Sequence, residues 1–137
     1  MTIKINIISN NNGYGLTQDY FFLNKMLSKT FPKKKLEIHF INFYDHKSDP
    51  SDINIFLETV SHIHTFNSKY NILIPNQEFF YKTCIPYISE FDHILVKTQY
   101  ANTIFSSFKC QNIAFLGWKS RDMYNPNIKK NYQKCLH

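Results

Sequence analysis

Polar side chains that could form the rim of a binding site stand directly after two apolar stretches of the sequence. Glu58 ends the stretch Ile53 to Leu57, and Asn76 and Glu78 follow the stretch that ends at Pro75. Carboxylates in such places can orient a substrate hydroxyl, and the Asn76 amide is a candidate for binding substrate or phosphate. Glu78 and Glu58 are therefore the candidate catalytic residues. A plain surface role for Glu58 and a helix-start role for Glu78 stay open.

A second set of candidates has the chemistry of phosphate binding. Gly13, Tyr14 and Gly15 follow the first apolar stretch, and glycines allow a backbone to approach a phosphate beside a helix N-terminus. The loop lacks the third glycine of a dinucleotide-binding motif and is not a Walker A loop, so a simple tight turn is the alternative. Lys97 ends another apolar stretch and can pair with an anion or with a carboxylate.

Ser120, Arg121 and Asp122 form a further polar cluster near the end of the sequence. Arg121 can bind phosphate or pair with Asp122, and a turn closed by the aspartate is the simpler alternative. The histidines form no HExxH or HxxE pattern and the three cysteines form no CxxC. We therefore expect no metal, no other cofactor and no disulfide framework. Ser or Cys nucleophile motifs are also missing.

The elements that must position these residues alternate between strand and helix. The apolar patterns predict strands at 3–8, 36–43, 53–57, 71–74, 94–97 and 113–116. They predict helices at 16–31, 79–91 (weak, with Pro86 inside) and 99–108, and a short helix or irregular crossing at 59–69. This order predicts a Rossmann-like three-layer α/β/α fold with a mainly parallel sheet of about six strands. Ligands bind beyond the carboxyl ends of such strands, where the candidates would meet.

Length and composition fit one globular domain. The chain has 137 residues, with 43% hydrophobic and 19% charged residues. Its net charge of +6 is concentrated in Lys33–Lys35 and in the lysines of the tail. No aromatic–basic stripe accompanies them, so we do not expect a nucleic acid as the partner. No transmembrane segment or signal peptide is evident, which favours a cytoplasmic protein. Abundant Ile, Asn, Lys, Phe and Tyr are typical of an AT-rich genome, such as that of a large DNA virus.

Several segments, taken in order, resemble the N-terminal half of a glycosyltransferase of the GT-B fold. The segments are "INIFLETV", "NILIPNQEFF", "FDHILVKTQYANTIF", "FLGWKSRDMY" and the closing "KCLH". They are similar to the NIFLE, PNPEW, KTRHA and GFTSRD motifs of a group 1 subgroup found in bacteria and giant viruses. The matched residues are Glu58, Pro75, Asn76, Glu78, Lys97, Thr98, Ala101, Gly117, Ser120, Arg121 and Asp122. The departures are Gln77, Phe79, Gln99, Tyr100, Trp118 and Lys119.

The resemblance implies a division of the chain and a reaction. Residues 1–122 would be the Rossmann-like acceptor-side domain, and 123–137 an interdomain linker or the start of a C-terminal domain missing from this chain. The whole enzyme would transfer a sugar from a nucleotide-sugar donor to a sugar, lipid or protein acceptor. The missing domain would hold most donor contacts, so this chain alone would turn over poorly. A stand-alone Rossmann-like binding or regulatory module, working with a partner chain, is the alternative.

Overall fold

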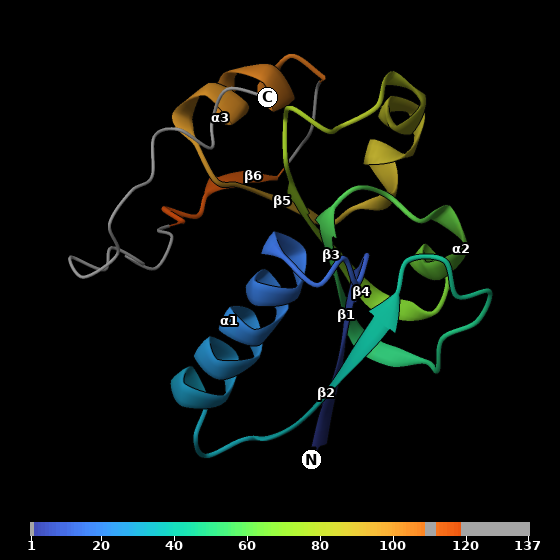
Figure 1. Cartoon of the computed structure of the whole chain (residues 1–137), viewed down its shortest axis with the longest axis vertical. Helices are drawn as coiled ribbons and strands as arrows, with labels where there is room; N and C mark the ends of the chain where they lie inside the picture. Colours follow the sequence, from blue (N-terminus) through green and yellow to red (C-terminus); the bar gives the residue numbers. More distant parts are fainter. Residues whose placement is uncertain (1, 109–111, 119–137) are drawn as a thin grey trace, which may run out of the picture.

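A six-stranded, all-parallel sheet forms the centre of the molecule and confirms the expected Rossmann-like α/β/α fold (Figure 1). The computed structural model describes residues 2–108 and 112–118. The strands are β1 (Thr2–Ser9), β2 (Lys35–Asn42), β3 (Ser51–Glu58), β4 (Ser68–Pro75), β5 (His93–Val96) and β6 (Ile113–Phe115). Their order across the sheet is β2-β1-β3-β4-β5-β6. The chain therefore moves from β1 to one side for β2 and then returns past β1 to place β3 on the other side.

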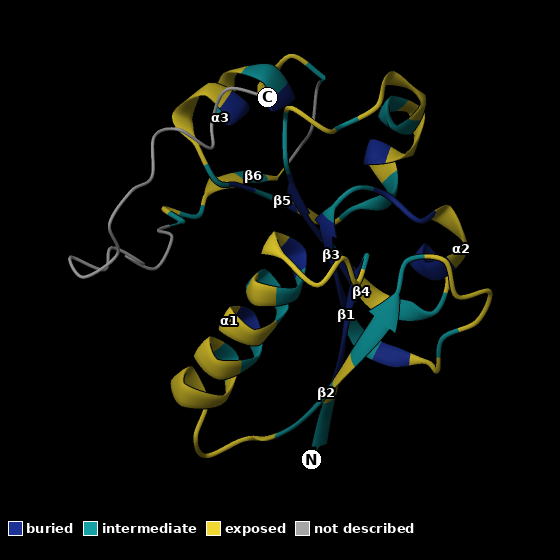
Figure 2. Ribbon diagram, in the orientation of Figure 1, coloured by how far each residue is buried: buried dark blue, intermediate teal, exposed yellow. Residues whose placement is uncertain are grey.

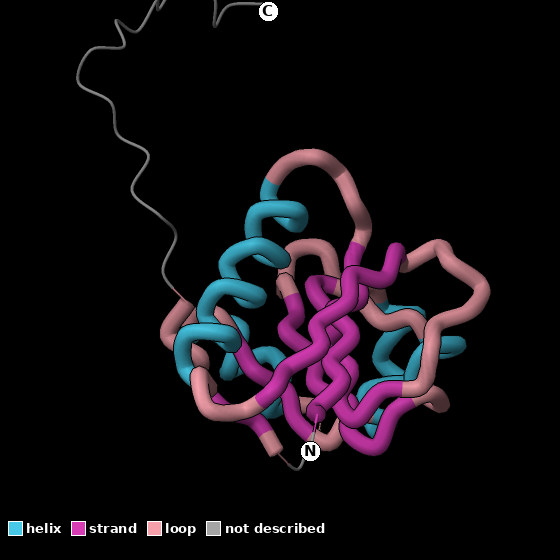
Figure 3. Tube along the Cα trace, turned by 90° about the horizontal axis from the view of Figure 1, so that it is seen from below, coloured by secondary structure: helices cyan, strands magenta, loops and turns pink. Residues whose placement is uncertain are grey.

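The helical segments are divided between the two faces of the sheet. Helix α1 (Gly15–Thr30) packs through Leu16 and Leu23 against the side chains that β1, β3 and β4 direct to one face. Helix α2 (His62–Thr65), the 3-10 helix η1 (Lys82–Glu90) and helix α3 (Gln99–Ser106) belong to the connections on the opposite face. Right-handed crossovers that run in opposite directions along a sheet place their connections on opposite faces. Figure 3 shows the strands in the middle of the fold, with α1 along one side.

Nearly continuous apolar runs make the central strands, because both faces of this sheet are covered. On β1, Ile5 and Ile7 belong to the cluster beneath α1, and Ile8 belongs to the cluster on the other face. Phe56 and Phe105 are fully buried in that second cluster. Figure 2 shows the deepest burial along the central strands, whereas β2, at the edge of the sheet, is only partly buried.

Three asparagines form a row across the middle of the sheet, on the face opposite α1. Asn6 of β1 is in register with Asn54 of β3, which is in register with Asn71 of β4. All three are buried, with no more than 7% of any of them exposed. A buried amide is costly unless it is hydrogen-bonded, so the row must have partners.

The partners are backbone carbonyls of the connections that cover this face. One belongs to Asp49, between β2 and β3, and two belong to His64 and Thr65 of α2. Asn6 Nδ2 donates to the Asp49 carbonyl at 3.0 Å, in the segment between β2 and β3. Asn54 Nδ2 donates to the His64 carbonyl at 2.8 Å. Asn71 Nδ2 donates to the Thr65 carbonyl at 2.9 Å. These connections contain at most one helical turn, so side chains of the sheet supply bonds that a longer crossover helix would make internally.

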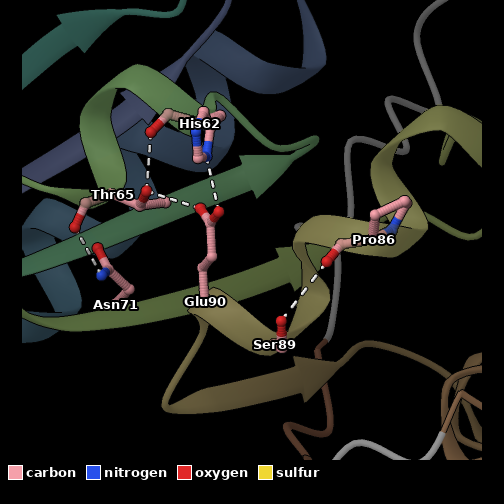
Figure 4. Close-up of polar contacts among 6 residues, drawn as sticks. All are labelled: His62, Thr65, Asn71, Pro86, Ser89 and Glu90. Atoms are coloured by element: carbon pink, nitrogen blue, oxygen red, sulfur yellow. Dashed lines mark hydrogen bonds and ion pairs between the residues drawn. The ribbon is translucent and has the colours of Figure 1, made fainter.

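A cluster of side chains joins α2 to the end of η1 (Figure 4). His62 Nδ1 lies 2.7 Å from Glu90 Oε1, and the Thr65 hydroxyl donates to Glu90 Oε2 at 2.7 Å. The same hydroxyl lies 2.7 Å from the His62 carbonyl. Together with the bond from Asn71 to Thr65, these contacts hold the short helix against β4 and η1.

The structure refines several of the expected elements. The weak helix expected at 79–91 is a 3-10 helix from Lys82 to Glu90 that contains Pro86, which cannot donate to a regular helical ladder. The uncertain crossing at 59–69 contains a helix of four residues. Strand β4 begins at Ser68, earlier than its apolar stretch, because pairing with β3 extends to this polar end.

Replacing Asn54 with alanine should lower the free energy of unfolding by about 3 kcal/mol. The change removes the donor to the His64 carbonyl and the acceptor of the Ser51 hydroxyl, which is 2.7 Å away. Urea unfolding followed by circular dichroism measures the effect. The matched control is Asn102→Ala on α3, where alanine is the better helix former and the expected change is within about 0.5 kcal/mol. Equal effects at the two positions would show that the asparagine row does not anchor the connections.

Stability should fall as the pH drops below about 6.5, because His64 is buried. Burial lowers the pKa of His64 below its ordinary value of 6.5, although Asp45 opposes this shift. The unfolded chain then binds a proton that the folded chain resists, at a cost of at most about 1.4 kcal/mol per pH unit. Urea unfolding at about pH 7 and about pH 5.5 should show a shallower slope for His64→Gln than for the wild type. Identical slopes would assign the pH dependence to other groups.

Candidate functional site

A pocket of about 340 Å³ lies at the carboxyl edge of the sheet, where the chain reverses its direction across the strands. Its walls come from the segments that follow β1, β2, β3 and β4. This is the switch point of a doubly wound sheet, where neighbouring connections separate to opposite faces and leave a crevice. The fold therefore places the pocket where the sequence analysis expected the candidates to meet.

Glu58 is the carboxylate that lines this pocket. It is the last residue of β3, and its φ of 73° lies in the left-handed region. That conformation costs a residue with a side chain roughly 1–2 kcal/mol. Such strain persists where the surroundings impose it, and it is concentrated at functional sites. Glu58 is therefore the stronger of the two catalytic candidates, because it lines the pocket and has a positive φ.

Asn76 fixes Glu58 from the neighbouring strand end. Asn76 Nδ2 donates to Glu58 Oε1 at 3.2 Å, and the Asn76 backbone N–H lies 3.5 Å from the Glu58 carbonyl. Asn76 Oδ1 accepts from the Glu78 backbone N–H at 3.2 Å, which closes the turn after β4. Asn76 thus braces the corner and orients the carboxylate.

Glu78 occupies a different position from Glu58. Glu78 is exposed and is not among the residues that line the pocket. Within the described part of the chain, its side chain has no hydrogen-bond partner, and only its backbone N–H is held, by Asn76. The structure brings Glu58 and Asn76 together and leaves the Glu78 carboxylate outside.

Two backbone amides of the glycine loop after β1 are bound by side chains of the loop and of α1. The Gly13 N–H donates to Thr17 Oγ1 at 3.0 Å, and the Tyr14 N–H donates to Asn12 Oδ1 at 2.9 Å. Gly13 has a φ of 72°, which explains the glycine without any ligand. Gly15 begins α1, and Thr17 lies inside that helix without capping it. Two of the amides proposed for phosphate binding therefore already have partners.

Lys97 is paired with a carboxylate, which was the second of its two expected roles. Its Nζ donates to Asp19 Oδ2 of α1 at 2.8 Å and lies 4.6 Å from the centre of the Trp118 ring. Both members of the ion pair are about four-fifths buried. Lys97 therefore connects the end of β5 to α1, and it is not among the pocket residues.

Some expectations concern residues whose structure is not described. Ser120, Arg121 and Asp122, and the expected linker at 123–137, lie outside the described residues. Within residues 2–108 and 112–118, no group of three His, Cys, Asp or Glu side chains could hold a metal ion. In the same ranges, none of the helices is long and apolar enough to cross a membrane.

Aromatic side chains that the sequence analysis did not select form much of the pocket wall. They are Phe43 and Tyr44 after β2, and Phe79 and Tyr81 after β4. Tyr44 is 70% exposed and Tyr81 is 67% exposed, so both rings are accessible to a ligand. A signal was present, because Phe43 ends an expected strand and Tyr44 directly follows it. They were not candidates, because the candidates were selected for charged, amide or serine hydroxyl groups or for the glycine loop, and not for aromatic rings.

Three further lining residues have polar side chains. Asn10, Thr59 and Cys84 add an amide, a hydroxyl and a thiol, and the Thr59 hydroxyl lies 3.8 Å from Cys84 Sγ. Among the described residues, no lysine, arginine or histidine lines the pocket. A carboxylate that only accepts, beside accessible aromatic rings, can bind the hydroxyl groups and the apolar face of a small ring.

Replacing Glu58 with glycine and, separately, with alanine isolates the backbone strain. Both variants lose the carboxylate and its bond to Asn76, but only alanine keeps a Cβ at a φ of 73°. We expect the glycine variant to be the more stable by about 1 kcal/mol in urea unfolding. At an unstrained strand position glycine is the less stable by roughly 0.5–1 kcal/mol, so that order would refute strain at residue 58.

Comparisons with known proteins leave the functional argument to the site itself. No family model, no curated protein and no solved structure matches the chain. What the structure shows is an all-parallel α/β fold with a pocket at its switch point, lined by Glu58 and by aromatic side chains.

Proposed function

We propose that the chain is the N-terminal, acceptor-side half of a glycosyltransferase that uses a nucleotide-sugar donor. The observation that carries this proposal is the switch-point pocket, in which Asn76 holds the Glu58 carboxylate beside Phe79, Tyr81 and other aromatic rings. Its sequence counterpart is the resemblance of the segments around Glu58 and Asn76 to the motifs of this enzyme class.

The pocket has the properties that an acceptor site needs. Glycosyl transfer requires an acceptor hydroxyl held in a defined direction, and a fixed carboxylate supplies that orientation. Accessible rings such as Tyr44 and Tyr81 can pack against the C–H face of a sugar while the hydroxyls reach polar groups. Glu58 is thus the proposed group that orients the acceptor hydroxyl, and Asn76 is a positioning residue for Glu58.

The pocket does not supply the charge that a nucleotide-sugar donor requires. A leaving diphosphate needs cations or unpaired backbone amides. Lys97 is paired with Asp19, and the amides of Gly13 and Tyr14 are bonded within their loop. The proposal therefore assigns most donor contacts to a second domain. Sugar transfer at a full enzymatic rate by this chain alone would contradict that assignment.

A binding module without catalysis is the second candidate function. Exposed tyrosines continue along the carboxyl edge beyond the pocket: Tyr14 after β1 is 79% exposed and Tyr100 after β5 is 69% exposed. Accessible aromatic residues gathered at one edge are typical of a surface that binds another protein. Binding of a partner chain at this edge, with no sugar bound, would favour this candidate.

Sugar binding should depend on the aromatic wall of the pocket. Saturation-transfer NMR with a panel of methyl glycosides should detect binding to the wild-type chain. Tyr81→Ala should abolish the signal or weaken it at least about tenfold, because a ring in contact with a ligand contributes on the order of 1.5 kcal/mol. The matched control is Tyr70→Ala, which removes another exposed tyrosine that does not line the pocket.

The outcomes separate the two candidates. Binding that is lost in Tyr81→Ala and kept in Tyr70→Ala supports an acceptor site. If no glycoside binds, or if both variants bind as the wild type does, the pocket is not an acceptor site and the proposed function is wrong.

A further inference from the structure

We infer that the switch-point pocket accepts a hydroxyl-bearing sugar ring without an anionic group and rejects anionic sugars. The inference rests on the proposed function and deepens it by naming the class of acceptor. It follows from three features of the pocket: its charge, the bonding of Glu58 and its size.

The charge of the pocket comes from Glu58. Among the described residues, the other lining side chains with polar groups are Asn10, Thr59, Cys84 and two tyrosines, and none is a cation. Lys97, the end-of-strand cation that the sequence suggested, is engaged by Asp19. A uronic acid or a sugar phosphate would bring a second negative charge next to Glu58, and no described lining residue would compensate it.

The bonding of Glu58 leaves one carboxylate oxygen for a ligand. Oε1 accepts from Asn76 Nδ2, whereas Oε2 has no protein donor among the described residues. An ionised carboxylate can only accept hydrogen bonds, so it selects ligand groups that donate. A sugar hydroxyl donates, and a carboxylate or phosphate monoester that is fully ionised does not.

The size of the pocket limits the ligand to one ring. Its volume of about 340 Å³ lies near the lower end of the range of roughly 300–1,000 Å³ for small-molecule sites. Phe79 and Tyr81 come from the turn after β4, and Phe43 and Tyr44 come from the segment after β2. Aromatic walls from two separate segments suit a ring that presents C–H groups on its faces and hydroxyls at its edge.

The experiment compares three glycosides that share one ring and differ in charge. Methyl glucoside is neutral, methyl glucosaminide carries an ammonium group, and methyl glucuronide carries a carboxylate. Each is titrated into the isotope-labelled chain, and the backbone amide signals of Thr59, Asn76 and Cys84 report binding at the pocket. We expect the neutral glycoside to bind at least about fivefold more tightly than the glucuronide, and the amino sugar to bind no more weakly than the neutral one.

Two variants assign the selectivity to its source. Glu58→Gln removes the negative charge and should reduce the difference between the neutral glycoside and the glucuronide to less than about twofold. The matched control is Glu78→Gln, which neutralises an exposed carboxylate at the same edge and should leave the difference unchanged. Amide spectra of both variants without ligand show whether each one is folded.

Cys84 gives a second measurement that needs no substitution at Glu58. Its side chain is half-buried and lines the pocket, so a bound ring should slow its alkylation. Mass spectrometry of the alkylated peptides reports Cys84 separately from Cys110 and Cys135. Methyl glucoside should slow alkylation of Cys84, and methyl glucuronide at the same concentration should slow it less.

The possible results distinguish this inference from the proposed function. Glucuronide that binds as tightly as the neutral glycoside overturns the inference on charge and leaves sugar binding at the pocket intact. Selectivity that persists in Glu58→Gln also overturns it, because another group would then reject the anion. Failure of all three glycosides to perturb the pocket signals overturns the proposed acceptor site and, with it, the inference.

Discussion

The fold depends on satisfying the backbone of connections that have almost no helix of their own. Parallel strands need long crossovers, and a crossover helix normally bonds its own carbonyls. Here the connections from β2 to β3 and from β3 to β4 contain only one helix, of four residues. The buried side chains of Asn6, Asn54 and Asn71 donate to three carbonyls of these connections, those of Asp49, His64 and Thr65. The polar row lies in the centre of the sheet, so its geometry determines how those segments lie over β1, β3 and β4. The buried His64 ring and the cluster of His62, Thr65 and Glu90 complete this layer.

The same three strands determine the shape of the candidate site. Strand β3 lies between β1 and β4, and its pairing with β4 extends to Glu58. The residue has to turn out of the sheet at that point, and it does so with a positive φ while Asn76 of the next corner holds its carboxylate. Strain and orientation at Glu58 therefore have one origin, the paired ends of two neighbouring strands. Glu58 is thus positioned by the sheet, whereas most of the other pocket residues belong to the segments that follow the strands.

Charge pairing divides the carboxyl edge into two regions with different chemistry. Lys97 is directed to Asp19 and Trp118 beneath α1, whereas Glu58 faces the pocket. In the glycine loop after β1, the amides of Gly13 and Tyr14 are bonded to Thr17 and Asn12. As a result, the described part of the chain offers an accepting group and aromatic surface at the switch point, and little that would hold a phosphate. This division is the physical basis for the proposal that acceptor and donor contacts belong to different domains.

The sequence by itself determined the order of strands and helices, and the position of Glu58 and Asn76 at strand ends, because apolar runs and their polar terminations are local patterns. It also indicated a mainly parallel sheet, since strands alternate with helical segments. Only the tertiary structure decided which strand ends adjoin, which brought Phe43, Tyr44, Phe79 and Tyr81 to one pocket and left Glu78 outside it. It also decided that Lys97 pairs with Asp19, 78 residues away in sequence. Strand order and such distant pairings depend on packing across the whole sheet, which no local pattern contains.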